Sequence, residues 1–485
     1  MIRPDAHIPP PQLPAPLARE HVSRRQLLEI GCSSLLGMGL TGVLAGRARA
    51  KERIEGEAST ITTTGSPPRA KSVLFVFLFG GPSHLDTFDP KPEAPAEYRG
   101  AYAPIATQLP GVNLCEHLPR LAQQIDKIAL VRTLASNPAF GDHRLAVHGL
   151  LGGIDELPAG AGLAASRRDW PCWGSVLESL RPRGDGLPTC VALPGEVTDP
   201  ATGSYPGQSG GFLGPKVDPY RFDRDPNKPD YRVDASLSLT GGMSISRLAA
   251  KRELLTEIDR QRATLTTAAE TQSFAGEQQA AFDVLTSGKL ADALALERET
   301  PLLRDRYGRH QFGQSLLLAR RLIQAGVPLV QANISYQALW DTHYNIYDAL
   351  PGLIPPFDMA ISALLEDMHV LGLLDETLVV VVGEFGRTPK IKQPDGSSIY
   401  FTKPGRDHWM NCFSGFFAGA GVRGGQVIGR SDSIGAFPVT RPYTHADIGA
   451  TVYSALGINP ATTIVDLQGR PAQLNRGEPI AALYS

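Results

Sequence analysis

The sequence predicts an α/β protein with a large, mostly parallel sheet covered by helices on both faces. Six short, continuous apolar runs indicate buried strands. In a parallel sheet covered by helices on both faces, the side chains on both sides of a strand are buried, so the whole strand is apolar. Segments with helical apolar spacing alternate with these runs. Of the 485 residues, 42% are hydrophobic and 20% are charged, which indicates a folded chain rather than a disordered one.

Taken in chain order, the runs and the segments between them define the elements. The predicted strands are 72–79, 127–132, 189–193, 328–333, 377–382 and 413–418. Two predicted helices, 312–325 and 357–371, precede the fourth and fifth strands, and each ends at a glycine, Gly326 and Gly372. Glycine is the usual residue just after a helix. Residues 72–485 are therefore predicted to form one α/β domain, in which the segment 243–300, rich in Ala, Glu, Arg and Leu, is a helical insertion or cap.

The N-terminal segment has the features of an export signal. Residues 22–28 read VSRRQLL, and residues 30–46 form an uncharged, Gly-rich apolar stretch. Ala48-Arg49-Ala50 then resembles a cleavage site. This order predicts a twin-arginine signal peptide over 1–50, a flexible linker over 51–71, and export to the periplasm or cell surface. No later apolar run approaches the roughly 20 residues of a membrane span.

Charge and cysteine content narrow the function classes. The chain has 47 basic and 49 acidic residues, without the basic excess typical of nucleic-acid binders. None of the four cysteines after the signal, Cys115, Cys172, Cys190 and Cys412, belongs to a C-x-x-C pair, so zinc-ribbon and thioredoxin motifs are absent. Disulfides and buried thiols both fit these cysteines.

Acidic residues and histidines follow several predicted strands. Ligands bind beyond the carboxyl ends of the strands in an open parallel sheet. Asp86 follows the first strand, Asp341 and His343 the fourth, Glu384 the fifth, and His408 lies further on. Carboxylates and imidazoles together suit divalent metals. Taken singly, each residue also fits a structural role, such as a helix cap or a hydrogen-bonded scaffold.

A fifth segment, 139–153, adds two histidines. Asp142, His143 and Arg144 are predicted to start a short helix that carries His148 in its second turn. A helix N-terminus attracts anions, and Arg144 would add bidentate donors. The alternative is that Asp142 only caps the helix and His148 packs inside.

These motifs resemble the bacterial family called domain of unknown function 1501, which is sulfatase-like and is assigned to the alkaline phosphatase superfamily. The matching segments are GGPSHLDTFDPKP, RYGRHQFGQSLLLARRLIQAG, WDTH, LLDETLVVVVGEFGRTPKI and GRDHW. The resemblance implies a metal-centred site that acts on sulfate or phosphate esters. The substrate would be an anionic small molecule or a sulfated or phosphorylated glycan.

The resemblance also implies roles for particular residues. A divalent ion (Zn, Ca, Mg or Mn) would be held by Asp86, Asp341, His343, Glu384 and His408, each either as a direct ligand or as a residue that supports one. The substrate anion would be held by Arg387, Arg144 and Arg406, and the general acid or base would be His143 or His84.

Two departures from the superfamily pattern bear on catalysis. Phe385 stands where the superfamily often has the histidine of an Asp-His pair, and no Ser, Thr or Cys lies between Asn137 and Gly153, where a nucleophile is expected. Water activated by a metal is the simpler nucleophile. The alternative is a catalytically eroded sulfatase-like protein that binds or supports other components of the envelope. An isomerase or phosphotransferase of the same superfamily is a third reading, which export makes less attractive.

Overall fold

The computed structural model describes residues 67–199, 203–231, 287–335, 337–394 and 402–485. The predicted signal peptide, most of the predicted linker and residues 243–286 of the predicted helical insertion lie outside the described residues. All described residues belong to one unit of the chain, Thr62–Ser485.

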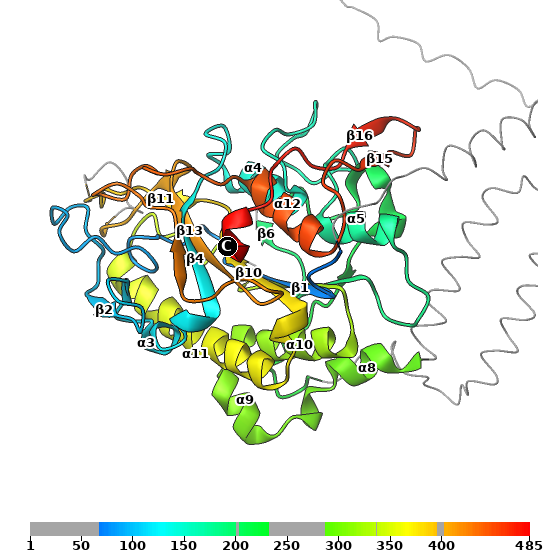
Figure 1. Ribbon diagram of the computed structural model, residues 1–485, viewed down its shortest axis with the longest axis horizontal. Helices are drawn as coiled ribbons and strands as arrows, with labels where there is room; N and C mark the ends of the chain where they lie inside the picture. Colours follow the sequence, from blue (N-terminus) through cyan, green and yellow to red (C-terminus); the bar gives the residue numbers. More distant parts are fainter. Residues whose placement is uncertain (1–66, 200–202, 232–286, 336, 395–401) are drawn as a thin grey trace, which may run out of the picture. The chain divides into compact units, whose positions relative to one another are not determined.

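An eight-stranded mixed sheet organises this unit (Figure 1). Its strands, in spatial order, are β14 (Gln426–Ile428), β4 (Ile128–Leu134), β13 (Phe413–Ala418), β10 (Thr377–Val382), β1 (Ser72–Phe77), β9 (Leu329–Asn333), β5 (Cys190–Leu193) and β8 (Tyr220–Arg221). All six predicted strands are confirmed, and the sheet is mostly parallel as predicted. The exception is β13, which runs antiparallel to both of its neighbours, β10 and β4.

Three central parallel strands set the position of the functional loops. In β1, Phe77 is paired with Val382 of β10 on one side and with Asn333 of β9 on the other. The three strands therefore end at the same edge of the sheet. The loops that begin with Leu78, Ile334 and Gly383 all leave from this edge.

Helices cover both faces of the sheet (Figure 1). Alternate β1 residues face opposite sides, as the strand period of two requires. Phe75 packs in one hydrophobic cluster with α4 (His143–Gly152), α5 (Trp173–Leu180) and α12 (His445–Ala455). Leu74 packs in a second cluster with α8 (Lys289–Leu294), α10 (Gln311–Ala325) and α11 (Ile346–Val370).

The helix α11 begins 11 residues earlier than the sequence predicts. It runs through Pro351, Pro355 and Pro356, which disfavour a helix interior because they lack an N–H group. Ile346, Leu350, Ile354 and Phe357 are spaced by three or four residues and are all buried. Packing of this apolar stripe outweighs the cost of the prolines.

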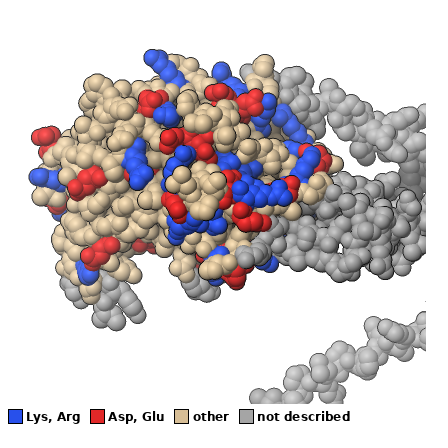
Figure 2. All heavy atoms as spheres, turned by 90° about the horizontal axis from the view of Figure 1, so that it is seen from below, with Lys and Arg blue, Asp and Glu red and all other residues tan. Residues whose placement is uncertain are grey.

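Smaller elements complete the described chain. They are the helices α3 (Pro119–Ala122) and α9 (Pro301–Tyr307) and the two-stranded sheets β2 (Pro104–Ala106) with β3 (Asn113–Cys115), β6 (Thr198–Asp199) with β7 (Gly203–Ser204), β11 (Gly386–Arg387) with β12 (His408–Trp409), and β15 (Thr463–Val465) with β16 (Pro471–Gln473). The four cysteines named above are buried free thiols. Within the described part of the chain, no helix combines the length and apolarity that crossing a bilayer requires. Figure 2 shows basic and acidic side chains interspersed over the face that it draws.

Candidate metal centre

Three histidines and one aspartate meet beyond the ends of β1, β9 and β10. His143 is the first residue of α4, which is capped by the Asp142 side chain. Asp341 and His343 lie in the loop after β9, and His408 lies in β12. Segments distant in the sequence thus supply one cluster.

The ring nitrogens of the histidines converge on a single carboxylate oxygen. Oδ1 of Asp341 lies 3.3 Å from Nε2 of His143, 3.0 Å from Nε2 of His343 and 3.2 Å from Nε2 of His408. The Nε2 atoms of His343 and His408 are 2.9 Å apart. Bonds of 2.0–2.1 Å to a tetrahedral zinc ion separate neighbouring ligand atoms by about 3.3 Å. These separations match the spacing of ligand atoms around one metal ion.

The second nitrogen of each histidine ring is held by an acceptor. Nδ1 of His143 lies 2.5 Å from Oε1 of Glu384, Nδ1 of His343 lies 2.6 Å from Oδ1 of Asp407, and Nδ1 of His408 lies 2.7 Å from the carbonyl oxygen of Gly141. An acceptor at Nδ1 keeps the proton there and directs the Nε2 lone pair to the centre, as in carboxylate–histidine–metal triads.

The environment of His143 tests whether a metal fits. Its Nε2 atom is buried and, although close to Asp341, makes no hydrogen bond of acceptable geometry. One donor atom each from His143, Asp341 and His408 lies within 4.8 Å of the other two. A divalent ion would satisfy the unpartnered nitrogen, so the residues present fit such an ion.

Charges around the cluster favour a cation. Burial raises the pKa of Asp341, but the three neighbouring histidines and the charge of Arg387 outweigh it and hold the pKa well below its usual range. Burial lowers the pKa of His143, but Asp341 and Glu384 outweigh it and raise the pKa to about 9. The site therefore stabilises positive charge at its centre.

The cluster is accessible from one side. The exposed fractions of the side chains are 27% for Asp341, 25% for His343, 19% for His408 and 10% for His143. A small molecule can therefore approach Asp341, His343 and His408, whereas His143 lies deeper.

Glu384, predicted to be a metal ligand, lies behind His143. Its buried carboxylate accepts the N–H groups of Gly80, at 3.0 Å, and Gly81, at 3.2 Å, in addition to its contact with Nδ1 of His143. Both glycines have positive φ, which lets the loop after β1 turn its N–H groups toward one carboxylate. In this structure Glu384 orients a candidate ligand.

Arg387, predicted to hold the substrate anion, is fully buried beneath the cluster. Its Nη2 atom lies 2.5 Å from Oδ1 of Asp341, and its guanidinium donates to the carbonyl oxygens of Gly80 and Gly81. These contacts occupy the guanidinium and position Asp341.

The remaining predicted site residues make other contacts. Asp86 forms a fully buried ion pair with Arg406, with 2.8 Å between Oδ2 and Nε. His84 is buried, with Nε2 2.8 Å from the carbonyl oxygen of Gly435. Arg144 pairs with Asp142 at 2.7 Å. These pairings do not bring Asp86, His84, Arg144 or Arg406 into the four-residue cluster.

Sequence reasoning missed two contributors and placed one differently. Asp407 and Gly141, which hold the rings of His343 and His408, were not singled out. Asp407 directly precedes His408 in the GRDHW motif, which was an available signal. His143, predicted to be a general acid or base, lies among the candidate ligands. His148 packs inside, and its Nε2 accepts the N–H group of Trp170 at 2.8 Å.

Comparison with protein families decides the affiliation. The family model described as "Protein of unknown function (DUF1501)" matches residues 70–484. The chain belongs to the DUF1501 family. This confirms the family resemblance of the sequence motifs. No curated protein matches this DUF1501 chain.

Several solved structures are similar to this DUF1501 protein. The crystal structure of Ps i-CgsB has 13% sequence identity and a TM-score of 0.38, covering 85% of this chain and 76% of the other. A mutant of TAB5 alkaline phosphatase with Mg bound has 13% identity and a TM-score of 0.36, covering 81% and 99%. The PsFucS1 sulfatase from Pseudoalteromonas sp. has 13% identity and a TM-score of 0.33, covering 85% and 72%.

Proposed function

We propose that this protein is an exported, metal-dependent hydrolase of sulfate or phosphate esters. A divalent ion would be held by His143, Asp341, His343 and His408. The observation that carries the proposal is the convergence of three Nε2 atoms on Oδ1 of Asp341 within 3.3 Å. Export by the twin-arginine route remains part of the proposal on the sequence motif alone.

The donor set favours one class of metal. Imidazole nitrogen suits zinc, iron and other transition metals, whereas magnesium and calcium prefer oxygen ligands. With three histidines and one carboxylate, zinc is the ion that we expect. Of the four metals predicted from the sequence, calcium and magnesium fit this donor set least well.

The charge of the filled site favours an anionic substrate. A divalent ion with three neutral imidazoles and one carboxylate leaves a net charge of +1 at the centre. When bound, the ion would supply a water nucleophile of lowered pKa and would neutralise charge on the ester oxygens. The exposed side of Asp341, His343 and His408 is where the ester would approach.

The chain's own residues prepare this centre. Glu384 holds the Nδ1 proton of His143, and Asp407 holds that of His343, so both rings are oriented before a substrate arrives. Arg387 fixes the Asp341 carboxylate and the loop after β1 together. Such preorganisation is what electrostatic catalysis requires.

The binding-protein alternative has one observation in its favour. The superfamily nucleophile is expected near the start of α4, where the first helical residue is His143 and its side chain joins the metal cluster. A covalent route through a hydroxyl or thiol of this helix is therefore closed. Hydrolysis by water remains open, and turnover decides between the two functions.

Elemental analysis of protein purified without chelators tests the proposal. We expect about one equivalent of a transition metal, lost in an Asp341→Ala, His343→Ala double variant. We also expect hydrolysis of 4-nitrophenyl sulfate or 4-nitrophenyl phosphate that chelation abolishes and zinc restores. Absence of metal from both the wild type and the double variant would refute the metal centre. Stoichiometric metal with saturable binding of a sulfated glycan and no turnover of either ester would favour the binding function.

A further inference from the structure

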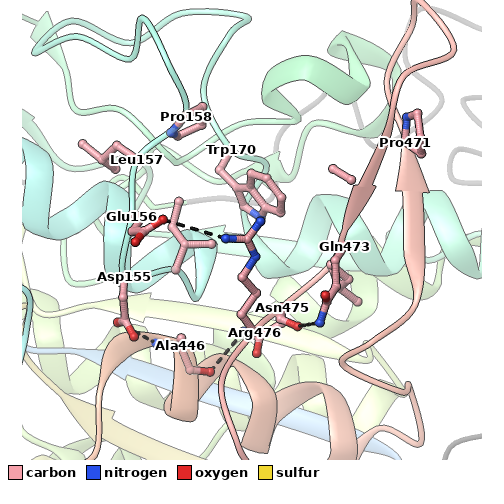
Figure 3. Close-up of a pocket in the computed structure, with 13 residues that line it drawn as sticks. Asp155, Glu156, Leu157, Pro158, Trp170, Ala446, Pro471, Gln473, Asn475 and Arg476 are labelled. Carbon is pink, nitrogen blue, oxygen red and sulfur yellow. Dashed lines mark hydrogen bonds and ion pairs between the residues drawn. The ribbon is translucent and has the colours of Figure 1, made fainter.

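A cavity lies beyond the C-terminal end of α4 (Figure 3). Its volume is about 550 Å³. One wall is formed by residues 154–158, which follow α4, and another by residues 471–476, which begin with β16. Trp170 and Ala446 complete the lining.

Hydrogen bonds fix the walls of this cavity. The carboxylate of Asp155 accepts the N–H group of Ala446, at 3.1 Å, and the hydroxyl of Thr444, at 2.7 Å. Asn475 donates to the carbonyl oxygens of Gly153, at 2.7 Å, and Ala446, at 3.0 Å. The two walls are thus tied to the start of α12, and the cavity is preformed.

Three side chains in the cavity have capacity left for a ligand. The indole Nε1 of Trp170 is buried and has no hydrogen-bond partner. Glu156 and Arg476 face each other at 3.8 Å, with exposed fractions of 82% and 80% (Figure 3). An exposed pair this long contributes little to stability, so both charged groups can turn to a ligand at small cost.

We propose that this cavity binds an uncharged sugar unit of a glycan. An indole offers an apolar surface and one N–H donor, which suit the C–H face and the hydroxyls of a sugar ring. Glu156, Arg476 and Gln473 add acceptors and donors that hydroxyl groups can use. Because the lining has two carboxylates, Asp155 and Glu156, and one guanidinium, it does not favour an anionic group.

The position of the cavity connects it with the metal centre. The helix α4 begins with His143 and spans ten residues, about 15 Å, before the chain enters the cavity wall. In addition, Nε2 of His445, the first residue of α12, lies 2.7 Å from the carbonyl oxygen of Glu384. Two helices therefore hold the cavity at a set distance from the cluster. On the proposed function, the substrate is then a glycan ester whose neutral unit occupies this subsite.

Calorimetric titration of the full chain tests this subsite. The probes are the neutral hexasaccharides cellohexaose, xylohexaose, mannohexaose and neoagarohexaose. We expect at least one to bind with a Kd below about 1 mM. Trp170→Ala should weaken that binding about tenfold or more, and the double variant Glu156→Gln, Arg476→Ala should weaken it similarly. The double variant changes only exposed side chains, so it keeps the test valid if Trp170→Ala fails to fold.

A matched control and a chelated sample complete the experiment. The double variant Asp305→Asn, Arg309→Ala removes another exposed ion pair and should bind the sugar as wild type does. Wild-type protein treated with a chelator should also keep its affinity for the sugar. Failure of the metal proposal and failure of the subsite proposal therefore give different results. Failure of all four sugars to bind, or equal binding by wild type and the Glu156→Gln, Arg476→Ala variant, would overturn the proposal.

Discussion

Nδ1 of His143 lies 2.5 Å from Oε1 of Glu384, and the same buried carboxylate accepts the backbone N–H groups of Gly80 and Gly81. One side chain thus joins the start of α4 to the loop after β1. Because the pairing keeps a proton on Nδ1, the Nε2 lone pair of His143 is directed to the cluster. Glu384 therefore contacts a proposed metal ligand and lies outside the four-residue cluster.

Glu384→Gln should weaken metal binding, with some loss of stability because an amide nitrogen cannot accept the backbone N–H groups that the carboxylate accepts. The amide keeps the size and one acceptor oxygen of the carboxylate but loses its charge. Changes in such outer partners typically reduce metal affinity by about 10–100-fold. Competition with a chromophoric zinc chelator measures the change. Glu478→Gln, which alters an exposed ion pair with Arg441, is the control and should bind zinc as wild type does. Equal zinc affinity of Glu384→Gln and wild type would contradict the assigned role.

His408→Ala should lower metal affinity further than Glu384→Gln, because it removes a proposed ligand rather than its partner. We expect that zinc raises the melting temperature of wild type and leaves that of the variant nearly unchanged, since a ligand stabilises only the state that binds it. His369→Ala is the matched control, because His369 is exposed in the last turn of α11. A variant that still copurifies with one equivalent of metal would remove His408 from the ligand set.

The sequence predicted the strands well because their signal is local. Continuous apolar runs identified β1, β10 and β13 to within two residues. The apolar run could not predict the direction of β13, because a buried strand has the same apolar pattern whether it is parallel or antiparallel. The early start of α11 was hidden by three prolines whose cost tertiary packing offsets.

The site was predictable by residue type and less so by role. Asp341, His343, His408 and His143 were all named from their places near strand or helix ends. Asp86 and Glu384 carry the same chemical groups as a metal ligand, and only the folded arrangement shows that Arg406 faces one and His143 the other. Which loops meet depends on the order of the strands in the sheet. The sequence of a single chain does not give that order.

The buried ion pair of Asp86 and Arg406 is predicted to stabilise the fold. Arg406→Met would leave a buried carboxylate without its partner, and breaking such a pair costs about 3–5 kcal/mol. In the double variant Asp86→Asn, Arg406→Met, the charge is absent and part of this loss should be recovered. Urea unfolding measures both values.

The metal content of Asp86→Asn separates this structural role from a ligand role. Folded Asp86→Asn protein should retain about one equivalent of metal, because its carboxylate pairs with Arg406 in the structure. Loss of metal from folded Asp86→Asn protein would restore Asp86 as a ligand.

His148 should make the protein less stable in mild acid. Burial lowers its pKa to about 4, an effect that nearby Asp169 only partly opposes, and its Nε2 accepts the N–H group of Trp170. The unfolded state has a His pKa of about 6.5 and gains a proton at higher pH than the folded state does. The stability contribution is therefore full above about pH 6.5 and is lost as the pH falls toward 4, by about 2–3 kcal/mol at pH 4.5.

His148→Gln isolates this effect. A glutamine side-chain oxygen can accept the Trp170 N–H group but does not titrate in this range. Buried His445, whose pKa is also lowered to about 4, is present in both proteins and cancels in the comparison. Urea unfolding at several pH values between about 7.5 and 4.5 should show a shallower fall in unfolding free energy for the variant. Parallel curves for variant and wild type would contradict the prediction, because they would mean that folding leaves the pKa of His148 unchanged.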